Sequence, residues 1–257
     1  MTWSACSGGA LRGAALVVPL VVTACSAAPP AEPQCGGAEA EVELRTSDGE
    51  VLIADWRPAA VAGAPAVVLL HMVPPSWDRS SWPGRVRREL GEAGWGVLTV
   101  DRRGAGQSTG EARDAYEGEG GRLDVEAAVA FLLGVDCAVD PDRLGLVGAS
   151  NGTTPVNDYA NGRDAELPAA AANVFMSPGT YTENQFVIDP SVDLGRPLLW
   201  LYPTNEPWSG AFLEGAPSGW RFVERGEVHG TQMLDGGELE AETVGELTAF
   251  FGEAFGR

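Results

Sequence analysis

The chain has 257 residues, of which 44% are hydrophobic, and a formal net charge of −19. This length and apolar content are sufficient for one large α/β domain. The negative charge argues against nucleic acids and anionic membrane surfaces as partners. All 17 basic residues are arginines, which excludes Ser-Lys dyads, Schiff-base lysines and the phosphate-binding lysine of a Walker loop.

Residues 1–24 have the features of a secretory signal peptide. Arg12 is the only charge before the apolar stretch Ala14–Ala24, which is too short for a comfortable membrane span. The segment Val22-Thr23-Ala24-Cys25 resembles a bacterial lipobox. This resemblance implies cleavage before Cys25, a diacylglycerol group on its sulfur, and export to the bacterial cell envelope. An ordinary signal peptide and an uncleaved anchor are the alternatives.

Residues 25–39, rich in proline and alanine, are expected to form a lipid-anchored flexible tether, followed by a folded domain over residues 40–257. After removal of the signal peptide and lipidation of Cys25, two cysteines remain, Cys35 and Cys137. In an oxidising compartment they are expected to form a disulfide that joins the end of the tether to the segment after the second helix. Two unpaired structural cysteines are the alternative.

Alternating apolar patterns predict the elements of an α/β domain. The Asp-Gly pair at Asp48-Gly49 predicts a hairpin between Glu41–Arg45 and Val51–Trp56. The other predicted strands are Ala66–His71, Gly96–Val100, Leu144–Val147, Ala171–Met176, Leu198–Tyr202 and Arg221–Val223. The predicted helices are Trp82–Ala93, Arg122–Leu133, a segment after Ser150, and one from about Glu238 to Phe255.

The alternation of strands and helices predicts a mostly parallel sheet of about eight strands, flanked by helices on both faces. Only Ser177–Arg196 separates the sixth and seventh strands, which leaves little room for a cap domain. Gly110–Gly121 is expected to be a mobile loop near the same edge of the sheet. No internal repeat is found.

The segment Gly148-Ala149-Ser150-Asn151-Gly152 follows a predicted strand and has the Gly-x-Ser-x-Gly pattern of a nucleophile elbow. Glycine fits there because larger side chains would collide with neighbouring backbone in so sharp a turn. The turn would raise the Ser150 hydroxyl and direct the N–H groups of the following helix at the atom that the serine attacks. A glycine-rich turn without a catalytic role is the alternative.

A serine nucleophile in this chain needs a histidine base, and only His71 and His229 are present. His229 follows the last predicted strand and is the candidate base. His71 ends an apolar run, and we expect it to brace the next loop through hydrogen bonds. Asp101 also ends a strand, and we expect it to fix the following turn.

Four segments in the same order resemble motifs of the α/β-hydrolase superfamily, as found in esterases and dienelactone hydrolases. One is the elbow around Ser150. Ala66–His71 with the prolines after it resembles the third strand and oxyanion loop. Asp101-Arg102-Arg103-Gly104-Ala105-Gly106-Gln107-Ser108 is similar to the turn after the fourth strand, and Leu198–Tyr202 with Glu206 behind it resembles the seventh strand and acid loop. The resemblance covers about residues 40 to 255.

The resemblance implies a serine hydrolase that transfers an acyl group, from an ester in the first instance, to water. Ser150 would be the nucleophile, His229 the base and Glu206 the acid that orients it. The backbone N–H of Asn151, with one from Met72 or Val73, would stabilise the oxyanion.

The chain departs from the family at two positions: Met72 stands where the family usually has glycine, and Glu206 replaces the commoner aspartate. For Asn151 only the backbone N–H is needed, so its side chain is expected to be free to vary.

No cofactor is expected, and no metal site, because no His, Cys, Asp or Glu residues have metal-ligand spacing. The expected partners are a small-molecule acyl substrate and a membrane, reached through the lipid on Cys25. The competing hypothesis is a non-catalytic surface lipoprotein that uses the fold to bind a ligand or partner. The Met72 departure favours this hypothesis, and the intact set of Ser150, Glu206 and His229 argues against it.

Overall fold

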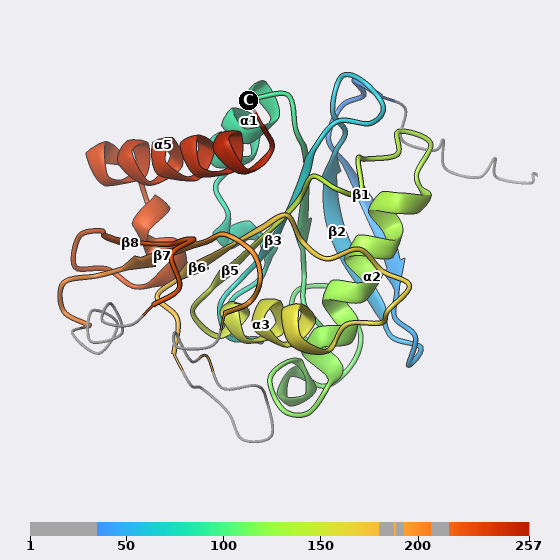
Figure 1. Ribbon diagram of the computed structural model, residues 1–257. Coiled ribbons are helices and arrows are strands. Elements are labelled where there is room, and N and C mark those ends of the chain that lie inside the picture. Colours follow the sequence, from blue (N-terminus) through green and yellow to red (C-terminus); the bar gives the residue numbers. More distant parts are fainter. Residues whose placement is uncertain (1–34, 180–187, 189–192, 207–215, 257) are drawn as a thin grey trace, which may run out of the picture. The chain divides into compact units, whose positions relative to one another are not determined.

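The computed structural model describes residues 35–179, 188, 193–206 and 216–256, which form an eight-stranded sheet with helices on both faces (Figure 1). The strands are β1 Ala40–Arg45, β2 Val51–Arg57, β3 Ala66–Leu70, β4 Gly96–Val100, β5 Leu144–Ala149, β6 Ala172–Met176, β7 Leu198–Tyr202 and β8 Trp220–Glu224. The helices are α1 Gly84–Glu92, α2 Gly120–Gly134, α3 Thr153–Gly162 and α5 Gly237–Ala254.

The strand order in the sheet is β1-β2-β4-β3-β5-β6-β7-β8. β2 pairs antiparallel with both β1 and β4, and all other neighbours pair parallel. This confirms the predicted α/β fold with a mostly parallel sheet. The hairpin between β1 and β2 closes at Gly49, whose φ of 98° suits glycine.

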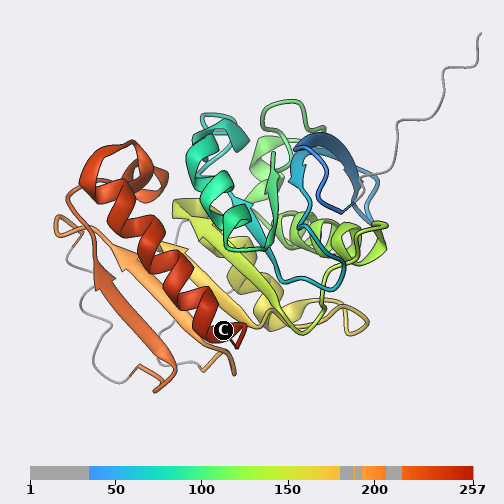
Figure 2. The ribbon, with the colours of Figure 1, turned by 90° about the horizontal axis from the view of Figure 1, so that it is seen from above.

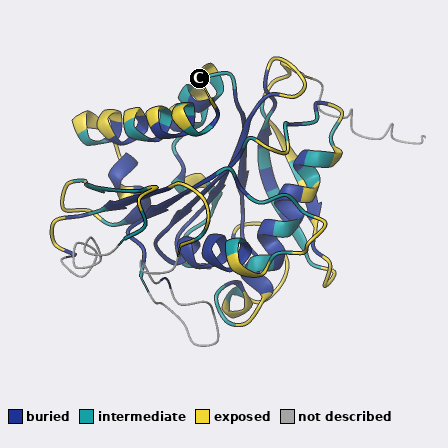
Figure 3. Cartoon of the chain, in the orientation of Figure 1, coloured by how far each residue is buried: buried dark blue, intermediate teal, exposed yellow. Residues whose placement is uncertain are grey.

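Helices α2 and α3 cover one face of the sheet, and α1 and α5 cover the other (Figures 1 and 2). Side chains alternate between the two faces along each strand. In β3, Val68 and Leu70 pack toward α2 and α3, while Val67 and Leu69 pack toward α1 and α5. Because both faces are covered, the central strands are buried along their length (Figure 3). This explains their continuous apolar sequences.

The predicted loop Gly110–Gly121 has more structure than the sequence indicated. Ala112–Ala115 forms a short 3-10 turn, and α2 begins already at Gly120. A Cβ on Gly120 would lie 2.3 Å from the carbonyl oxygen of Asp114, so this close contact requires glycine. Since glycine disfavours helices, its presence hid the start of α2.

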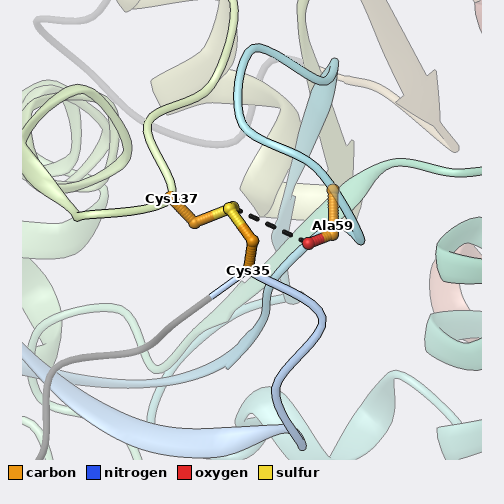
Figure 4. Close-up of a disulfide and its surroundings, with 3 residues drawn as sticks. All are labelled: Cys35, Ala59 and Cys137. Atoms are coloured by element: carbon orange, nitrogen blue, oxygen red, sulfur yellow. Dashed lines mark hydrogen bonds between the residues drawn. A yellow bond between two sulfur atoms is a disulfide. The ribbon is translucent and has the colours of Figure 1, made fainter.

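Cys35 and Cys137 form the predicted disulfide (Figure 4). Their Cα atoms are 5.0 Å apart, and the bond links positions 102 residues apart in the sequence. Gly36 N–H donates to the Ala59 carbonyl, and the Cys137 sulfur lies 3.7 Å from the same oxygen. The disulfide therefore ties the segment before β1 to the connection between α2 and β5.

The predicted signal peptide, residues 1–24, and Cys25 lie outside the described residues. Within the described part of the chain, no helix has both the length and the apolar character that crossing a membrane requires.

Candidate active site

Three of the predicted site residues lie just beyond the carboxyl ends of parallel strands. Ser150 follows β5, Glu206 lies in the loop after β7, and His229 lies in the loop after β8. The carboxyl ends of parallel strands share one edge of the sheet, where α/β proteins place their binding sites. The topology therefore brings together residues that are far apart in the sequence.

The turn that carries Ser150 is tight and strained. Ser150 has a φ of +52°, which residues other than glycine rarely adopt. A Cβ on Gly148 would lie 2.2 Å from the carbonyl oxygen of Gly152, and one on Gly152 would lie 2.5 Å from that of His71. Both glycines of the Gly-x-Ser-x-Gly pattern are therefore required by close backbone contacts. The second contact also sets the elbow directly against the loop after β3.

The structure joins Ser150, His229 and Glu206 in one hydrogen-bonded chain. His229 Nε2 lies 2.6 Å from the Ser150 Oγ, and His229 Nδ1 is hydrogen-bonded to Glu206 Oε1. The carboxylate can only accept, so Nδ1 donates to it and Nε2 is left to accept from the serine hydroxyl. Glu206 is buried, whereas the His229 side chain is 35% exposed. The imidazole is therefore partly accessible from solvent.

Hydrogen bonds between loops hold the acid and the histidine in place. Thr204 N–H donates to the Gly226 carbonyl at 2.8 Å, and Asn205 Nδ2 donates to the Glu227 carbonyl at 2.8 Å. On the other side of the histidine, Gly230 N–H donates to Ser177 Oγ at 2.9 Å. Sequence reasoning missed Ser177, whose one signal was its position immediately after β6.

The loop after β3 presents the second half of the predicted oxyanion hole. The Met72 carbonyl accepts from His71 Nδ1 at 2.8 Å and from Arg102 Nη1 at 3.2 Å. Because the peptide unit is planar and trans, the N–H of Val73 points away from the Met72 carbonyl. No hydrogen bond joins the Val73 N–H to another described residue. Of the two predicted donors in this loop, Val73 is therefore the one whose orientation is fixed by two hydrogen bonds.

Arg102 connects the elbow to the loop after β3, and sequence reasoning missed this contact. Its fully buried guanidinium donates from Nη1 to Asn151 Oδ1 at 2.9 Å and from Nη2 to the Ala115 carbonyl at 2.5 Å. Burial lowers the pKa of Arg102 to about 10, so it remains a cation at neutral pH. The expectation that the Asn151 side chain is free to vary was wrong, because this side chain accepts a hydrogen bond from a buried cation. The one signal for Arg102 in the sequence was its position directly after Asp101, where β4 ends.

His71 braces the loop, as the sequence predicted. Its Nε2 accepts from the Arg102 N–H at 3.0 Å, while Nδ1 donates to the Met72 carbonyl. Burial, together with the charge of Arg102, lowers the pKa of His71 to about 3. The imidazole is therefore neutral, and both of its nitrogens are already bonded, so His71 has no free nitrogen with which to act as a base.

Met72 fills space beside Gly230, next to His229. Its side chain is 2% exposed, and a Cβ on Gly230 would lie 2.5 Å from the Met72 sulfur. Gly230 also has a φ of +57°, which glycine adopts easily. The bulk of Met72, where the related motif has glycine, is thus accommodated by a glycine next to His229. The departure leaves the Val73 N–H in place.

Asp101 fixes the turn after β4. Its carboxylate accepts from the backbone N–H groups of Arg79 and Gln107 and forms an ion pair with the Arg79 guanidinium. Burial raises the pKa of Asp101. Within the described ranges, no three His, Cys, Asp or Glu side chains are grouped so that they could hold a metal ion.

No protein-family model and no curated protein matches this chain. Its fold is similar to that of several solved structures. The esterase PF2001 of Pyrococcus furiosus has a TM-score of 0.66 and 16% identity, over 85% of this chain and 92% of that one. The esterase RhEst1 of Rhodococcus sp. ECU1013 has a TM-score of 0.64 and 17% identity, over 83% of this chain and 99% of that one.

GrgF of Penicillium sp. sh18, an alpha/beta hydrolase, has a TM-score of 0.65 and 15% identity, over 84% of this chain and 99% of that one. At these identities the likeness establishes the α/β-hydrolase fold, and any activity has to be argued from the site.

Proposed function

We propose that this chain is a serine hydrolase that cleaves a carboxylic ester through Ser150, His229 and Glu206. The observation that carries the proposal is the continuous hydrogen-bonded chain from the Glu206 carboxylate through His229 to the Ser150 hydroxyl. A serine, a histidine and a carboxylate hydrogen-bonded in this order are the arrangement expected of a nucleophilic site.

In the first half of the reaction, His229 Nε2 takes the proton from Ser150 Oγ as the oxygen attacks the carbonyl carbon of the ester. The bond between Oγ and carbon forms, and the carbonyl electrons move onto oxygen. The tetrahedral intermediate collapses when His229 returns the proton to the leaving alcohol, which gives an acyl-enzyme. In the second half, water attacks the acyl carbon as His229 takes its proton. The bond between this carbon and Ser150 Oγ then breaks, His229 returns the proton to Oγ, and the acid product leaves. Glu206 holds the imidazole tautomer and stabilises the imidazolium.

The developing oxyanion would be bound by the backbone N–H groups of Asn151 and Val73. Loss of one such donor typically costs about 3–4 kcal/mol of transition-state stabilisation. The planar peptide that orients Val73 and the bond from Arg102 to the Asn151 side chain both support this assignment. We further propose a preference for short acyl chains, because the short connection between β6 and β7 leaves little sequence for a cap over a long one.

A fluorophosphonate probe tests whether Ser150 is activated, without knowledge of the substrate. Wild-type protein should be labelled at one site, identified as Ser150 by peptide mass spectrometry, and Ser150→Ala should not be labelled. His71→Asn retains Ser150, His229 and Glu206 and should still be labelled at Ser150, at a rate lowered by the loss of the brace on the loop after β3. A folded wild-type protein that resists the probe would instead support the non-catalytic lipoprotein, in which the fold only binds a ligand or partner.

We also propose that the protein is exported and anchored to the bacterial cell envelope by a lipid on Cys25. The lipobox-like segment before Cys25 supports this proposal, and so does the Cys35–Cys137 disulfide, since disulfides persist in oxidising compartments. Expressed in a host with lipoprotein-processing enzymes, the protein should partition into detergent and carry acyl mass on Cys25. Cys25→Ser should abolish both properties. Wild-type protein that begins downstream of Cys25 without a lipid would contradict the anchor.

A further inference from the structure

A polar cavity of about 250 Å³ lies at the end of the sheet opposite to Ser150. Its lining includes Arg163 at the end of α3, Asn173 near the start of β6, and Arg196 just before β7. β6 and β7 run parallel to β5, so their starts lie at the opposite edge from the carboxyl end that carries Ser150. The cavity is therefore separate from the triad.

The two arginines of this cavity, Arg163 and Arg196, differ from most arginines of the described residues because neither forms an ion pair there. Among the residues that the structure describes, every arginine except Arg102, Arg163 and Arg196 forms an ion pair with a carboxylate. Arg102 is buried and donates to carbonyl and amide oxygens. The two arginines that remain both line this cavity. The chain has 36 acidic residues, so a shortage of carboxylates does not explain why neither arginine pairs with a carboxylate of the described residues.

The nearest carboxylates along the chain cap their own loops. Asp164 Oδ1 accepts from the Glu166 N–H at 2.9 Å, and Asp193 Oδ1 accepts from the Gly195 N–H at 2.8 Å. Arg163 donates from Nε to the Leu167 carbonyl at 3.1 Å, which anchors the guanidinium at the end of α3. This bond leaves the two terminal nitrogens of Arg163 for another acceptor.

Asn173 supplies an independent sign of a ligand. The residue is 1% exposed, and its side-chain Oδ1 has no hydrogen-bond partner among the described residues. Buried side-chain oxygens without a partner are rare in native proteins, because their desolvation is not compensated. Asn173 lines the cavity, so a ligand there with a hydroxyl or N–H group is a candidate donor to this oxygen.

We propose that the cavity binds a small carboxylate or phosphate anion that also carries a hydrogen-bond donor for Asn173. Guanidinium groups bind both kinds of anion through paired N–H···O bonds. The volume is below that of cavities for drug-sized ligands, which fits a small metabolite. This site does not depend on the proposed hydrolase activity, and the Ser150→Ala variant should bind the anion as wild type does.

Isothermal titration with succinate and with inorganic phosphate, in a chloride buffer of constant ionic strength, tests the charge contacts. At least one of the two anions should bind saturably at a single site, and the arm that saturates identifies the anion class. Arg163→Gln and Arg196→Gln should each weaken binding about tenfold or more. Arg45→Gln, which removes the same charge from an exposed pair with Glu43, should leave it unchanged.

Two results would overturn the proposal. One is a response to either anion that sodium chloride reproduces at equal ionic strength. The other is equal weakening in Arg45→Gln. Circular dichroism on every variant establishes that it is folded before it is titrated.

A comparison of malate with succinate tests the role of Asn173, because the two dicarboxylates differ by one hydroxyl. Wild-type protein should bind malate more tightly than succinate, and Asn173→Ala should bind the two equally. Equal binding of both by the wild type, or a malate preference that survives in Asn173→Ala, would contradict the assignment of a donor to Asn173.

Discussion

The two halves of the candidate active site are held in place by different means. The elbow and oxyanion loop lie at the centre of the sheet, where buried Arg102 and His71 bond to Asn151 and to the loop backbone. Glu206 and His229 lie beyond β7 and the edge strand β8, where the bonds between their loops are exposed. The core thus holds the groups proposed as oxyanion donors, whereas loops near the surface hold the groups proposed to transfer the proton. Changes in the first half should affect both stability and turnover, and changes in the second mainly turnover.

The largest effect should come from the triad. Ser150→Ala and His229→Ala should each lower hydrolysis of short-chain esters by a factor on the order of 10⁴–10⁶, and the double variant should lose little more, because the residues act as a unit. Glu206→Gln should be less severe, since an amide can still orient the imidazole. Steady-state kinetics measures all four. Retained activity in His229→Ala, with loss in His71→Asn, would reverse the assignment.

His71 belongs to the half of the candidate site that is held by the core. Because it is buried, its titration should make the stability of the protein depend on pH. Its pKa is about 3 in the folded protein, against 6.5 when exposed, so the unfolded chain binds more protons between these values. Stability should therefore fall as the pH decreases from about 6.5 to about 3, by up to about 1.4 kcal/mol per pH unit from this group. Urea unfolding of wild type and His71→Asn across this range isolates the contribution.

The buried carboxyl of Asp124, whose pKa is raised to about 6 by burial, has the opposite effect and is present in both proteins, so it cancels. Parallel stability curves for wild type and His71→Asn would contradict the buried neutral histidine.

The disulfide lies outside both halves of the candidate site. Its removal should therefore lower the stability of the protein without lowering its turnover. Cys35→Ser opens a cross-link between positions 102 residues apart, which should cost about 2–5 kcal/mol of unfolding free energy. Ester hydrolysis at a temperature where the variant remains folded should stay close to that of wild type. Chemical denaturation with and without a reductant measures the first quantity. A large loss of activity in a folded Cys35→Ser protein would mean that the site depends on this distant link.

A matched pair of substitutions, one in each half of the candidate site, compares how strongly each half affects turnover and stability. Asn151→Ala removes the acceptor of a bond from a buried cation, and Asn205→Ala removes a neutral, exposed bond between the acid and histidine loops. Asn151→Ala should lower kcat by about 10- to 100-fold with little change in KM, and should also reduce the thermal midpoint. Asn205→Ala should cost severalfold at most and leave the midpoint nearly unchanged. Equal effects would remove the distinction between a core-coupled and a surface half.

The strands and the order of the site residues were predictable because they depend on local patterns. Buried strands appear as continuous apolar runs, and the elbow needs glycine on both sides of Ser150, as the close contacts of Gly148 and Gly152 explain. The roles of Arg102 and Ser177 were not predictable in this way. Each acts through contacts between segments that are distant in sequence, such as the contact of Arg102 with Asn151. The periodic pattern of apolar residues does not indicate which distant carbonyl or amide group a side chain contacts.

The proposed mechanism requires a covalent intermediate at Ser150, and trapping that intermediate tests the mechanism most directly. Wild-type protein mixed with a short-chain nitrophenyl ester and quenched with acid within the first turnovers should gain the mass of one acyl group, on the peptide that contains Ser150. Ser150→Ala should gain none. Glu206→Gln should show the same adduct, formed more slowly. Ester hydrolysis without an adduct on Ser150, or an acyl group found on another residue, would contradict the central claim.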